Sequence, residues 1–219
     1  MGAEELNSFA RSSYDYGFRR DAHQLLAWGY QDTLPQIHYR LQEEETTGLI
    51  VEAIEKRLDN PSTPKKFDRY SIDEEKPFAI EGRRGKKRRR LDLVVVSSHS
   101  RPRPKYIFEA KRLRKNSYPI GRYMGEDGLQ CFTKGVYASQ YSEAAMVGYM
   151  QSDAASYWET ELKRCFENDL HNSLCIKQQI QKVKILPSMP NVWVSEHERS
   201  SLRSITVYHI FLDCSASSA

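Results

Sequence analysis

The segments LDLVVV (residues 91–96) and YIFEAK (residues 106–111) decide the fold class of this 219-residue chain. Their apolar and β-branched residues predict two adjacent β-strands that bury at least one face. Three ionisable residues interrupt this pattern, Asp92 in the first segment and Glu109 and Lys111 in the second. Moving an unpaired charge out of water costs several kcal/mol of free energy. We therefore expect these side chains to contact one another or a metal ion.

The spacing of these residues also predicts the register of the two strands. The two-residue period of a strand places Glu109 and Lys111 on the same face. The Arg- and Pro-rich link of residues 97–105 lets the second strand turn back beside the first. A symmetric link would place Asp92 opposite Ala110, with the acid and the lysine of the second strand on the wrong face. We therefore expect a one-residue offset or a β-bulge, a feature that is common beside active sites.

Two carboxylates on adjacent strands, followed by a lysine, offer oxygen ligands for a hard divalent cation and a positive charge near an attacking water. This arrangement resembles the PD-(D/E)XK nuclease superfamily. Asp92 matches the first acid of the motif, and Glu109, Ala110 and Lys111 match its ExK tripeptide. Leu91 replaces the proline that precedes the first acid in the family, and no functional group is lost. The alternative is a structural salt bridge across a half-exposed hairpin.

The resemblance implies an endonuclease that hydrolyses phosphodiester bonds with Mg²⁺, or with Mn²⁺ in its place. It implies that Asp92 and Glu109 bind the metal ion and that the carbonyl of Ala110 adds a ligand. Lys111 would position and activate water while offsetting charge in the transition state. The implied substrate is DNA, with RNA left open, cut to leave a 5′ phosphate in bacterial restriction, defence or repair. Many relatives act as homodimers, and a larger defence complex is the other assembly considered.

Relatives commonly carry a further glutamate on a helix upstream of the first strand. Residues 37–58 predict such a helix, because their apolar positions approximate one helical face. The stretch EEETTGLI (residues 43–50) is similar to the acidic-Thr-Gly-apolar opening of many superfamily members. We select Glu44 as the catalytic and metal-orienting carboxylate, with Glu43 and Glu45 as alternatives. A purely structural role stays open, since glutamates in a first helical turn also complement the helix dipole.

Positive charge is concentrated beside the proposed acids. The chain has a net charge of +4, but residues 83–115 contain fourteen Lys or Arg against two acids, so the rest of the chain carries −8. RRGKKRRR (residues 83–90) predicts the tip of a hairpin between residues 78–82 and 91–96. Two other interpretations are a solvated hairpin and a nuclear-import-like cluster. Because concentrated like charges favour a polyanion, we predict that nucleic-acid phosphates are bound by Arg83, Arg84, Lys86, Lys87, Arg88, Arg89, Arg90, Arg101, Arg103 and Lys105.

The length suits one domain over residues 1–219, with its core at about 37–212. No apolar run reaches the roughly 18 residues of a membrane span, and no secretory segment is recognised at the start, so we expect a cytoplasmic protein without a membrane partner. Four cysteines without CxxC spacing predict reduced, partly buried thiols.

Other patterns predict a loosely ordered extension over residues 1–30, a loop over 60–76, helices over 127–138 and 154–168, and strands over 144–150, 191–200 and 205–213.

Polar residues near the C-terminus suggest one more site. If residues 191–200 are extended, Ser195, His197 and Arg199 share a face that could touch phosphate. We favour ordinary polar residues at an exposed strand end, and we expect His209 to be a core histidine. We recognise no Ser or Cys nucleophile arrangement and no phosphate-binding or ATP-binding motif.

The sequence therefore predicts an α/β domain with a mixed central β-sheet flanked by helices and a restriction-endonuclease-like core. The predicted function is that of a Mg²⁺-dependent endodeoxyribonuclease. A non-catalytic nucleic-acid-binding module, acting through the basic hairpin of residues 83–90, is the first alternative. A basic partner-binding protein without a nucleic-acid role is the second, and a steep loss of DNA affinity with salt would exclude it.

Overall fold

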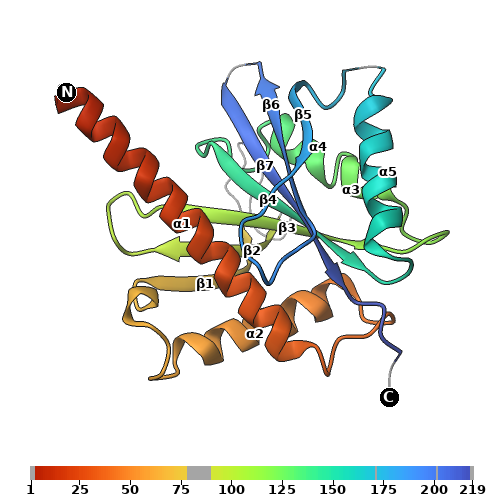
Figure 1. Ribbon diagram of the computed structural model, residues 1–219, viewed down its shortest axis with the longest axis horizontal. Helices are drawn as coiled ribbons and strands as arrows, with labels where there is room; N and C mark the ends of the chain where they lie inside the picture. Colours follow the sequence, from red (N-terminus) through yellow and green to blue (C-terminus); the bar gives the residue numbers. More distant parts are fainter. Residues whose placement is uncertain (1–2, 78–89, 171, 201, 218–219) are drawn as a thin grey trace.

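A seven-stranded mixed β-sheet forms the centre of the computed structural model, which describes residues 3–77, 90–170, 172–200 and 202–217 (Figure 1). Its strand order is β1-β2-β3-β4-β7-β6-β5. β3, β4 and β7 are parallel to one another, and the remaining neighbours are antiparallel. The strands are β1 (Tyr70–Pro77), β2 (Arg90–Ser97), β3 (Lys105–Leu113), β4 (Glu143–Met150), β5 (Ile176–Lys182), β6 (Val192–Arg199) and β7 (Leu202–Asp213).

Helices cover both faces of this sheet. Alternate residues of β2 divide between two buried apolar clusters: Leu93 and Val95 pack with α1 and α2, and Val94 and Val96 pack with α3, α4 and α5. The result is a three-layer arrangement, in which each face of the sheet is buried by its own helices (Figure 1). The helices are α1 (Ala3–Thr33), α2 (Glu43–Leu58), the 3₁₀ helix η1 (Lys65–Phe67), α3 (Ile120–Met124), α4 (Leu129–Thr133) and α5 (Ala155–Glu167).

The predicted fold class is confirmed: the protein is α/β, with a mixed sheet flanked by helices. β2, β3, β4 and β7 each include the strand predicted for their region, and β6 lies within the predicted strand of residues 191–200. α5 agrees with its predicted helix to within one residue at each end, and α2 ends where predicted but begins at Glu43 instead of residue 37. The predicted helix over residues 127–138 is shorter, because α4 ends at Thr133 and Gly135 adopts a positive φ of 67°. None of the described helices is long and apolar enough to cross a membrane.

The N-terminal region corrects the prediction of a loosely ordered extension. Residues 3–33 form α1, and Phe18, Ala22, Leu25 and Leu26 are buried in the cluster between this helix and the sheet. The core therefore begins well before residue 37. Polar residues interrupt the apolar positions of α1, so its sequence shows little of the hydrophobic periodicity that predicts a helix. The helix is stabilised by packing on the sheet.

Two strands lie where the sequence predicted none. β1 (residues 70–77) begins within the predicted surface loop of residues 60–76 and pairs antiparallel with β2, with Ile72 opposite Val95. β5 is an edge strand whose side chains are mostly exposed, so it lacks the apolar alternation that marks a buried strand. The predicted strand over residues 78–82 lies outside the described residues. All four cysteines are free thiols, and two of them are buried, as predicted.

Gly29 allows α1 and α2 to approach closely. A Cβ atom at this position would lie 2.7 Å from the backbone oxygen of Ile50 and 2.6 Å from Cγ1 of Ile54. We therefore expect Gly29→Ala to lower the free energy of unfolding by about 1–3 kcal/mol through overpacking. A Cβ atom at Gly17, on the same helix, would have no such atom within 4 Å. Gly17→Ala should therefore raise the free energy of unfolding by up to about 1 kcal/mol, because alanine favours the helix. Urea denaturation tests both variants, and effects of the same sign would contradict this account.

Candidate active site

The register of β2 and β3 brings the three motif residues together. Leu93 pairs with Phe108, and continuing this register by one residue places Asp92 beside Glu109. The predicted one-residue offset is therefore confirmed. Asp92, Glu109 and Lys111 consequently project on the sheet face whose apolar side chains pack against α3, α4 and α5.

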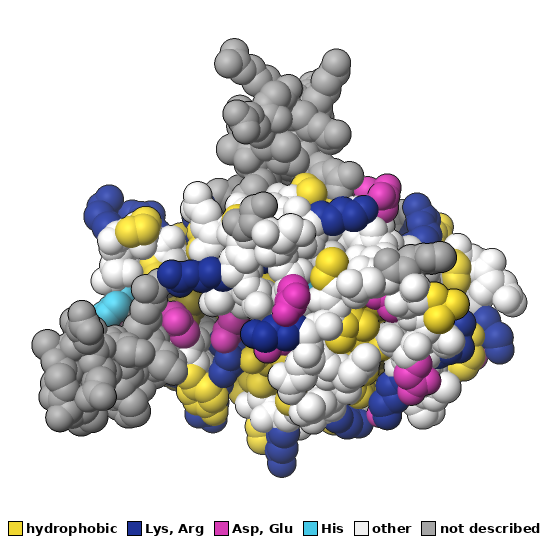
Figure 2. All heavy atoms as spheres, turned by 90° about the horizontal axis from the view of Figure 1, so that it is seen from above, with side chains coloured by type: hydrophobic (Ala, Val, Ile, Leu, Met, Phe, Trp, Pro, Cys, Tyr) yellow, Lys and Arg dark blue, Asp and Glu magenta, His cyan; other side chains and the backbone are white. Residues whose placement is uncertain are grey.

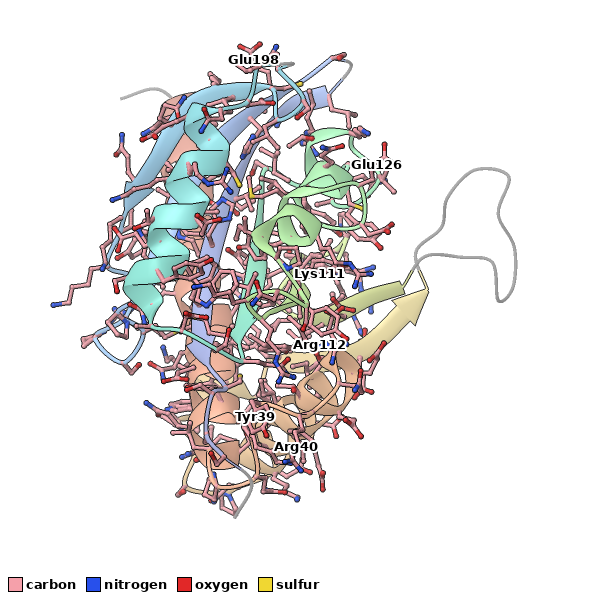
Figure 3. The ribbon with its side chains drawn as sticks, turned by 90° about the vertical axis from the view of Figure 1, so that its right-hand side faces the viewer. Tyr39, Arg40, Lys111, Arg112, Glu126 and Glu198 are labelled. Carbon is pink, nitrogen blue, oxygen red and sulfur yellow. The ribbon has the colours of Figure 1, made fainter. Side chains whose placement is uncertain are left out.

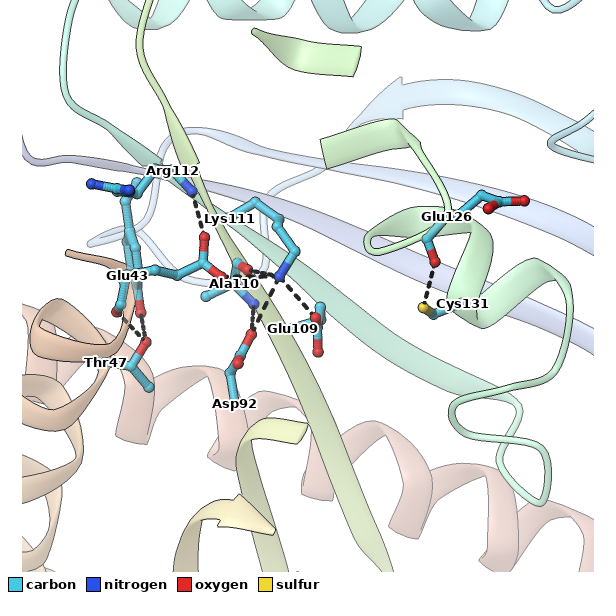
Figure 4. A network of polar contacts seen from close by, with 10 residues as sticks. Glu43, Thr47, Asp92, Glu109, Ala110, Lys111, Arg112, Glu126 and Cys131 are labelled. Carbon is cyan, nitrogen blue, oxygen red and sulfur yellow. Dashed lines mark hydrogen bonds and ion pairs between the residues drawn. The ribbon is translucent and has the colours of Figure 1, made fainter. Parts of the chain in front are cut away.

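Lys111 lies at the centre of the site (Figure 4). Its Nζ donates hydrogen bonds to Glu109 Oε1 at 2.8 Å, to Glu43 Oε1 at 3.0 Å and to the carbonyl of Ala110 at 2.6 Å. The same nitrogen lies 3.8 Å from Asp92 Oδ2. Four oxygens from β2, β3 and the start of α2 therefore surround one ammonium group.

The helix carboxylate that reaches this group is Glu43, whereas the sequence favoured Glu44. The second carboxylate oxygen of Glu43 accepts a hydrogen bond from the backbone N–H of Arg112 at 3.0 Å. Glu44 is exposed, and Glu45 accepts from the backbone N–H of Gln42 at 2.6 Å as part of a capping box. The geometry therefore reverses the preference among the three glutamates and assigns Glu45 a structural role.

The sequence contains only a partial signal for Glu43, namely its helical spacing from residues that the structure shows to be buried. Glu43 lies four residues before Thr47, so the two share a face of α2 with Ile50 and Ile54. Thr47, Ile50 and Ile54 are buried, and the hydroxyl of Thr47 contacts that of Tyr149 on β4 at 2.9 Å. The face that packs on the sheet therefore carries Glu43 to the site.

Burial and mutual repulsion change the protonation of the two strand acids. Burial first, and then the charge of Asp92, raise the pKa of Glu109 to about 8. Burial also raises the pKa of Asp92 to about 6, against the opposing effects of Lys111 and of a 2.7 Å hydrogen bond from the N–H of Ala110. Burial lowers the pKa of Lys111, but the surrounding carboxylates outweigh it, and the net direction is upward. Lys111 is therefore charged at neutral pH, and the two acids are poised to titrate near it.

The donor atoms suit a hard divalent cation, although they now surround an amine. Carboxylate and carbonyl oxygens are the ligands that Mg²⁺ and Mn²⁺ prefer. Glu109 is only 3% exposed, and its Oε2 has no hydrogen-bond partner among the residues that the structure describes. Within the same described part of the chain, no three acidic, His or Cys side chains are spaced to hold a metal ion. The oxygens of Glu43, Glu109 and Ala110 instead converge on the ammonium of Lys111.

The site opens into a pocket of about 270 Å³ with charges of both signs. Carboxylates come from the start of α2 and from Asp127, and the positive groups are one ammonium and two guanidinium groups. Such a lining suits an anionic ligand together with a cation. The pocket is lined by Gln42, Glu43, Glu44, Lys111, Arg112, Tyr118, Arg122 and Asp127.

The predicted phosphate-binding residues do not surround this pocket in the part of the chain that the structure describes. Arg83 to Arg89 lie outside the described residues. Arg101, Arg103 and Lys105 lie at the opposite end of the β2–β3 hairpin, with Lys105 about 13 Å from Glu109 along the strand. Figure 2 shows one face of the molecule, on which described Lys and Arg side chains are interspersed with Asp and Glu side chains. The pocket residues Arg112, Tyr118 and Arg122 are not among the site residues predicted from the sequence, although Arg112 directly follows the ExK tripeptide.

The polar residues of β6 form a buried network rather than a phosphate contact or an exposed strand end. Ser195 Oγ lies 2.7 Å from His197 Nε2 and 2.8 Å from His209 Nε2. His209 Nδ1 lies 3.0 Å from the hydroxyl of Tyr123, and Arg199 donates to three backbone carbonyls. Both interpretations of Ser195, His197 and Arg199 were wrong, because β6 is an interior strand between β5 and β7. The prediction that His209 is a core histidine is confirmed.

Fold and site together define an α/β protein in which three carboxylates surround a lysine beside a pocket of mixed charge. Comparison with protein-family models, curated proteins and solved structures found no match for this chain. Its function is therefore argued from the chemistry of this site.

Proposed function

We propose that the protein is a metal-dependent nuclease that hydrolyses phosphodiester bonds, with DNA as its main substrate. The carrying observation is the convergence of three carboxylates and Lys111 beside a pocket that also contains Arg112 and Arg122. The carboxylates would repel a phosphodiester alone, and the arginines would repel a metal ion alone. A phosphodiester bound together with a divalent cation satisfies both sets of charges.

Asp92, Glu109 and Glu43, with the carbonyl of Ala110, would hold Mg²⁺ or Mn²⁺, which would polarise the phosphate and make a bound water more acidic. The partnerless Oε2 of Glu109 supports this fit, because a buried carboxylate oxygen without a donor is costly. The oxygens of Glu43, Glu109 and Ala110 that would hold the cation now accept hydrogen bonds from Lys111, and Asp92 Oδ2 lies 3.8 Å from the same amine.

The protein's own side chains would position the reactants and balance charge. Lys111, whose pKa is raised by the surrounding carboxylates, provides a charged N–H donor at neutral pH that would orient water and stabilise the negative charge that develops on the phosphate. Glu43 holds that amine and is itself fixed by the backbone N–H of Arg112. Asp92 is fixed in the same way by the backbone N–H of Ala110. Both acids are thus held by rigid strand backbone, which preorganises the site.

In this proposal the enzyme acts in the cytoplasm, in restriction, defence or repair, and leaves a 5′ phosphate. A homodimer would allow both strands of a duplex to be cut. These assignments extend the resemblance to the PD-(D/E)XK nucleases, whose two acids and lysine are matched by Asp92, Glu109 and Lys111.

Incubation with plasmid DNA, single-stranded DNA or RNA tests the activity. We expect cleavage with Mg²⁺ or Mn²⁺ and none with EDTA. Asp92→Asn should reduce the rate by about 100-fold or more, because it removes a charged oxygen while preserving an acceptor for the N–H of Ala110. Asp59→Asn is the matched control, since Asp59 is exposed at the end of α2. Equal cleavage by both variants, or no metal-dependent cleavage of any substrate, would contradict the proposal.

A second candidate is a non-catalytic nucleic-acid-binding module. One observation favours it: Lys111 already forms ion pairs with the buried Glu109 and the partly exposed Glu43. In such a module, the acids and the lysine would be structural. DNA binding without any metal-dependent cleavage, unaffected by Asp92→Asn, would support this candidate over the nuclease.

A further inference from the structure

Two arginines are held against Tyr118 at the edge of the pocket. The guanidinium carbon of Arg112 lies 3.8 Å from the centre of the Tyr118 ring, and that of Arg122 lies 5.7 Å from it. All three residues line the pocket that contains Lys111. We call Arg112, Tyr118 and Arg122 the first triplet.

A second arginine–tyrosine triplet is joined to the first. The guanidinium carbons of Arg40 and Arg114 lie 5.3 Å and 5.1 Å from the centre of the Tyr39 ring. Arg114 also pairs with Tyr118 through two backbone hydrogen bonds of 3.0 and 2.8 Å. In Figure 3, the labelled Lys111, Arg112, Tyr39 and Arg40 follow one another along this side of the molecule. The second triplet, Arg40, Tyr39 and Arg114, therefore continues the positive surface away from the pocket.

The four arginines of the two triplets lack ion pairs with carboxylates in the part of the chain that the structure describes. Other described arginines, such as Arg57 with Asp32, do form such pairs. A cation–π contact orients a guanidinium group without cancelling its charge. Four oriented guanidinium groups without such ion pairs, two lining the pocket and two continuing away from it, are suited to a polyanion.

Resting on the proposed function, we propose that the two triplets bind successive phosphates of the nucleic-acid strand that enters the pocket. The strand would run from Lys111 past Tyr118 to Tyr39. Contacts to phosphates position a strand without reading its bases. The substrate would therefore be a polynucleotide strand several nucleotides long, recognised at this surface independently of its sequence.

The test measures binding of the full-length protein to a fluorescent single-stranded DNA of about 20 nucleotides in EDTA, from about 0.05 to 0.2 M salt. The double variant Arg40→Ala, Arg122→Ala removes one exposed arginine from each triplet. We expect about tenfold weaker binding at low salt. Loss of two phosphate contacts should also reduce the slope of log affinity against log salt by about 1.4.

The matched control is the double variant Arg20→Ala, Arg203→Ala. Both residues are exposed, and neither forms an ion pair among the described residues. They lie towards the other end of the parallel strands, because Arg203 is near the start of β7 and the neighbouring Arg19 pairs with Glu143 at the start of β4. This control should keep the affinity and salt slope of the unaltered protein. Equal effects of the two double variants would overturn the inference.

Substitutions of Tyr118 test whether its ring orients the arginines. Tyr118→Phe retains an aromatic face and should bind DNA like the unaltered protein, whereas Tyr118→Leu should bind several-fold more weakly. Equal affinity of these two variants would overturn the role of the ring. Binding in EDTA is measured separately from cleavage. If the protein cuts DNA but these binding predictions fail, only the role of the two triplets is contradicted. If the binding predictions hold but no metal-dependent cleavage occurs, only the nuclease proposal is contradicted.

Discussion

Lys111→Ala is expected to abolish metal-dependent cleavage and, at the same time, to increase the affinity of the free protein for Mg²⁺ or Mn²⁺. The ammonium group now occupies oxygens that a metal ion would need, because its Nζ donates hydrogen bonds to three oxygens within 3.0 Å. Removing it eliminates this competition and leaves the carboxylates without a counter-charge. Cleavage should fall by about 100-fold or more, since a charge that stabilises the transition state is lost.

Stability provides a readout of this variant that does not depend on activity. Glu109 has a side chain that is 4% exposed, and Lys111 is its only ion-pair partner among the described residues. Removing one member of a buried ion pair costs about 3–5 kcal/mol, so Lys111→Ala should melt at a lower temperature without metal. Adding Mg²⁺ should then raise its melting temperature more than that of the unaltered protein, because a ligand that binds only the folded state stabilises it. Calorimetric titration with Mn²⁺ gives the affinities directly.

Lys163→Ala is the matched control for these measurements. Lys163 is half-exposed and pairs with Glu159 one turn earlier on α5, so its loss should change stability by less than about 1 kcal/mol. Metal affinity and cleavage should not change. If Lys111→Ala binds metal no more tightly than the unaltered protein, the acids do not form a metal site.

Acid should destabilise the protein through His23, and His23→Phe should remove this effect. His23 is completely buried; its Nδ1 contacts the carbonyl of Arg19 at 2.8 Å, and its Nε2 has no partner among the described residues. Burial lowers its pKa from 6.5 to about 4, a shift that the backbone hydrogen bond opposes. Between these values the unfolded chain binds more protons than the folded protein. The stabilising contribution is therefore present above pH 6.5 and is lost towards pH 4.

The size of the effect follows from the titration window. Each pH unit below 6.5 should reduce the free energy of unfolding by about 1.4 kcal/mol through His23 alone. The raised pKa values of Glu109 and Asp92 act in the opposite direction, but they are common to both proteins and cancel in the comparison. Phenylalanine can take the place of the imidazole, which packs edge-on against Tyr106 and Tyr208.

Urea denaturation at about pH 8 and about pH 5 measures this difference. Relative to the unaltered protein, His23→Phe should be more stable at the lower pH than at the higher one by about 2 kcal/mol. The higher pH also reports the cost of repacking, because His23 is then neutral in both the folded and the unfolded state. If the stability difference between His23→Phe and the unaltered protein is the same at both pH values, His23 does not cause the acid destabilisation.

Much of the sheet and half of the site could be predicted from local patterns. Strand periodicity placed Glu109 and Lys111 on one face, and the need to pair their charges with Asp92 required the one-residue offset that the structure contains. Both arguments concern residues within about 20 positions of each other. Over such distances, the geometry of a strand pair leaves few alternatives.

The errors arose where packing between distant segments decides the outcome. α1 could not be predicted from hydrophobic periodicity, because polar residues separate its apolar positions. Its apolar residues are recognised as core only because the structure buries them against the sheet. The rotation of α2, set by Ile50 and Ile54, selects Glu43 over Glu44. Neither result follows from helix propensity, because adjacent glutamates at the start of a helix are nearly equivalent until one face is buried.

The sequence by itself determined the α/β class, the adjacent strands β2 and β3, and the two acids and the lysine that these strands carry. Alternating polarity and uncompensated charge are local properties, so they can be read without coordinates. Only the tertiary structure decided which glutamate completes the site and which arginines surround it. Arg112 and Arg122 meet at Tyr118 because the chain turns back after β3, whereas Arg101 and Arg103 lie in the link before β3 begins. Proximity between such groups depends on where the strands end, and sequence spacing alone does not contain that information.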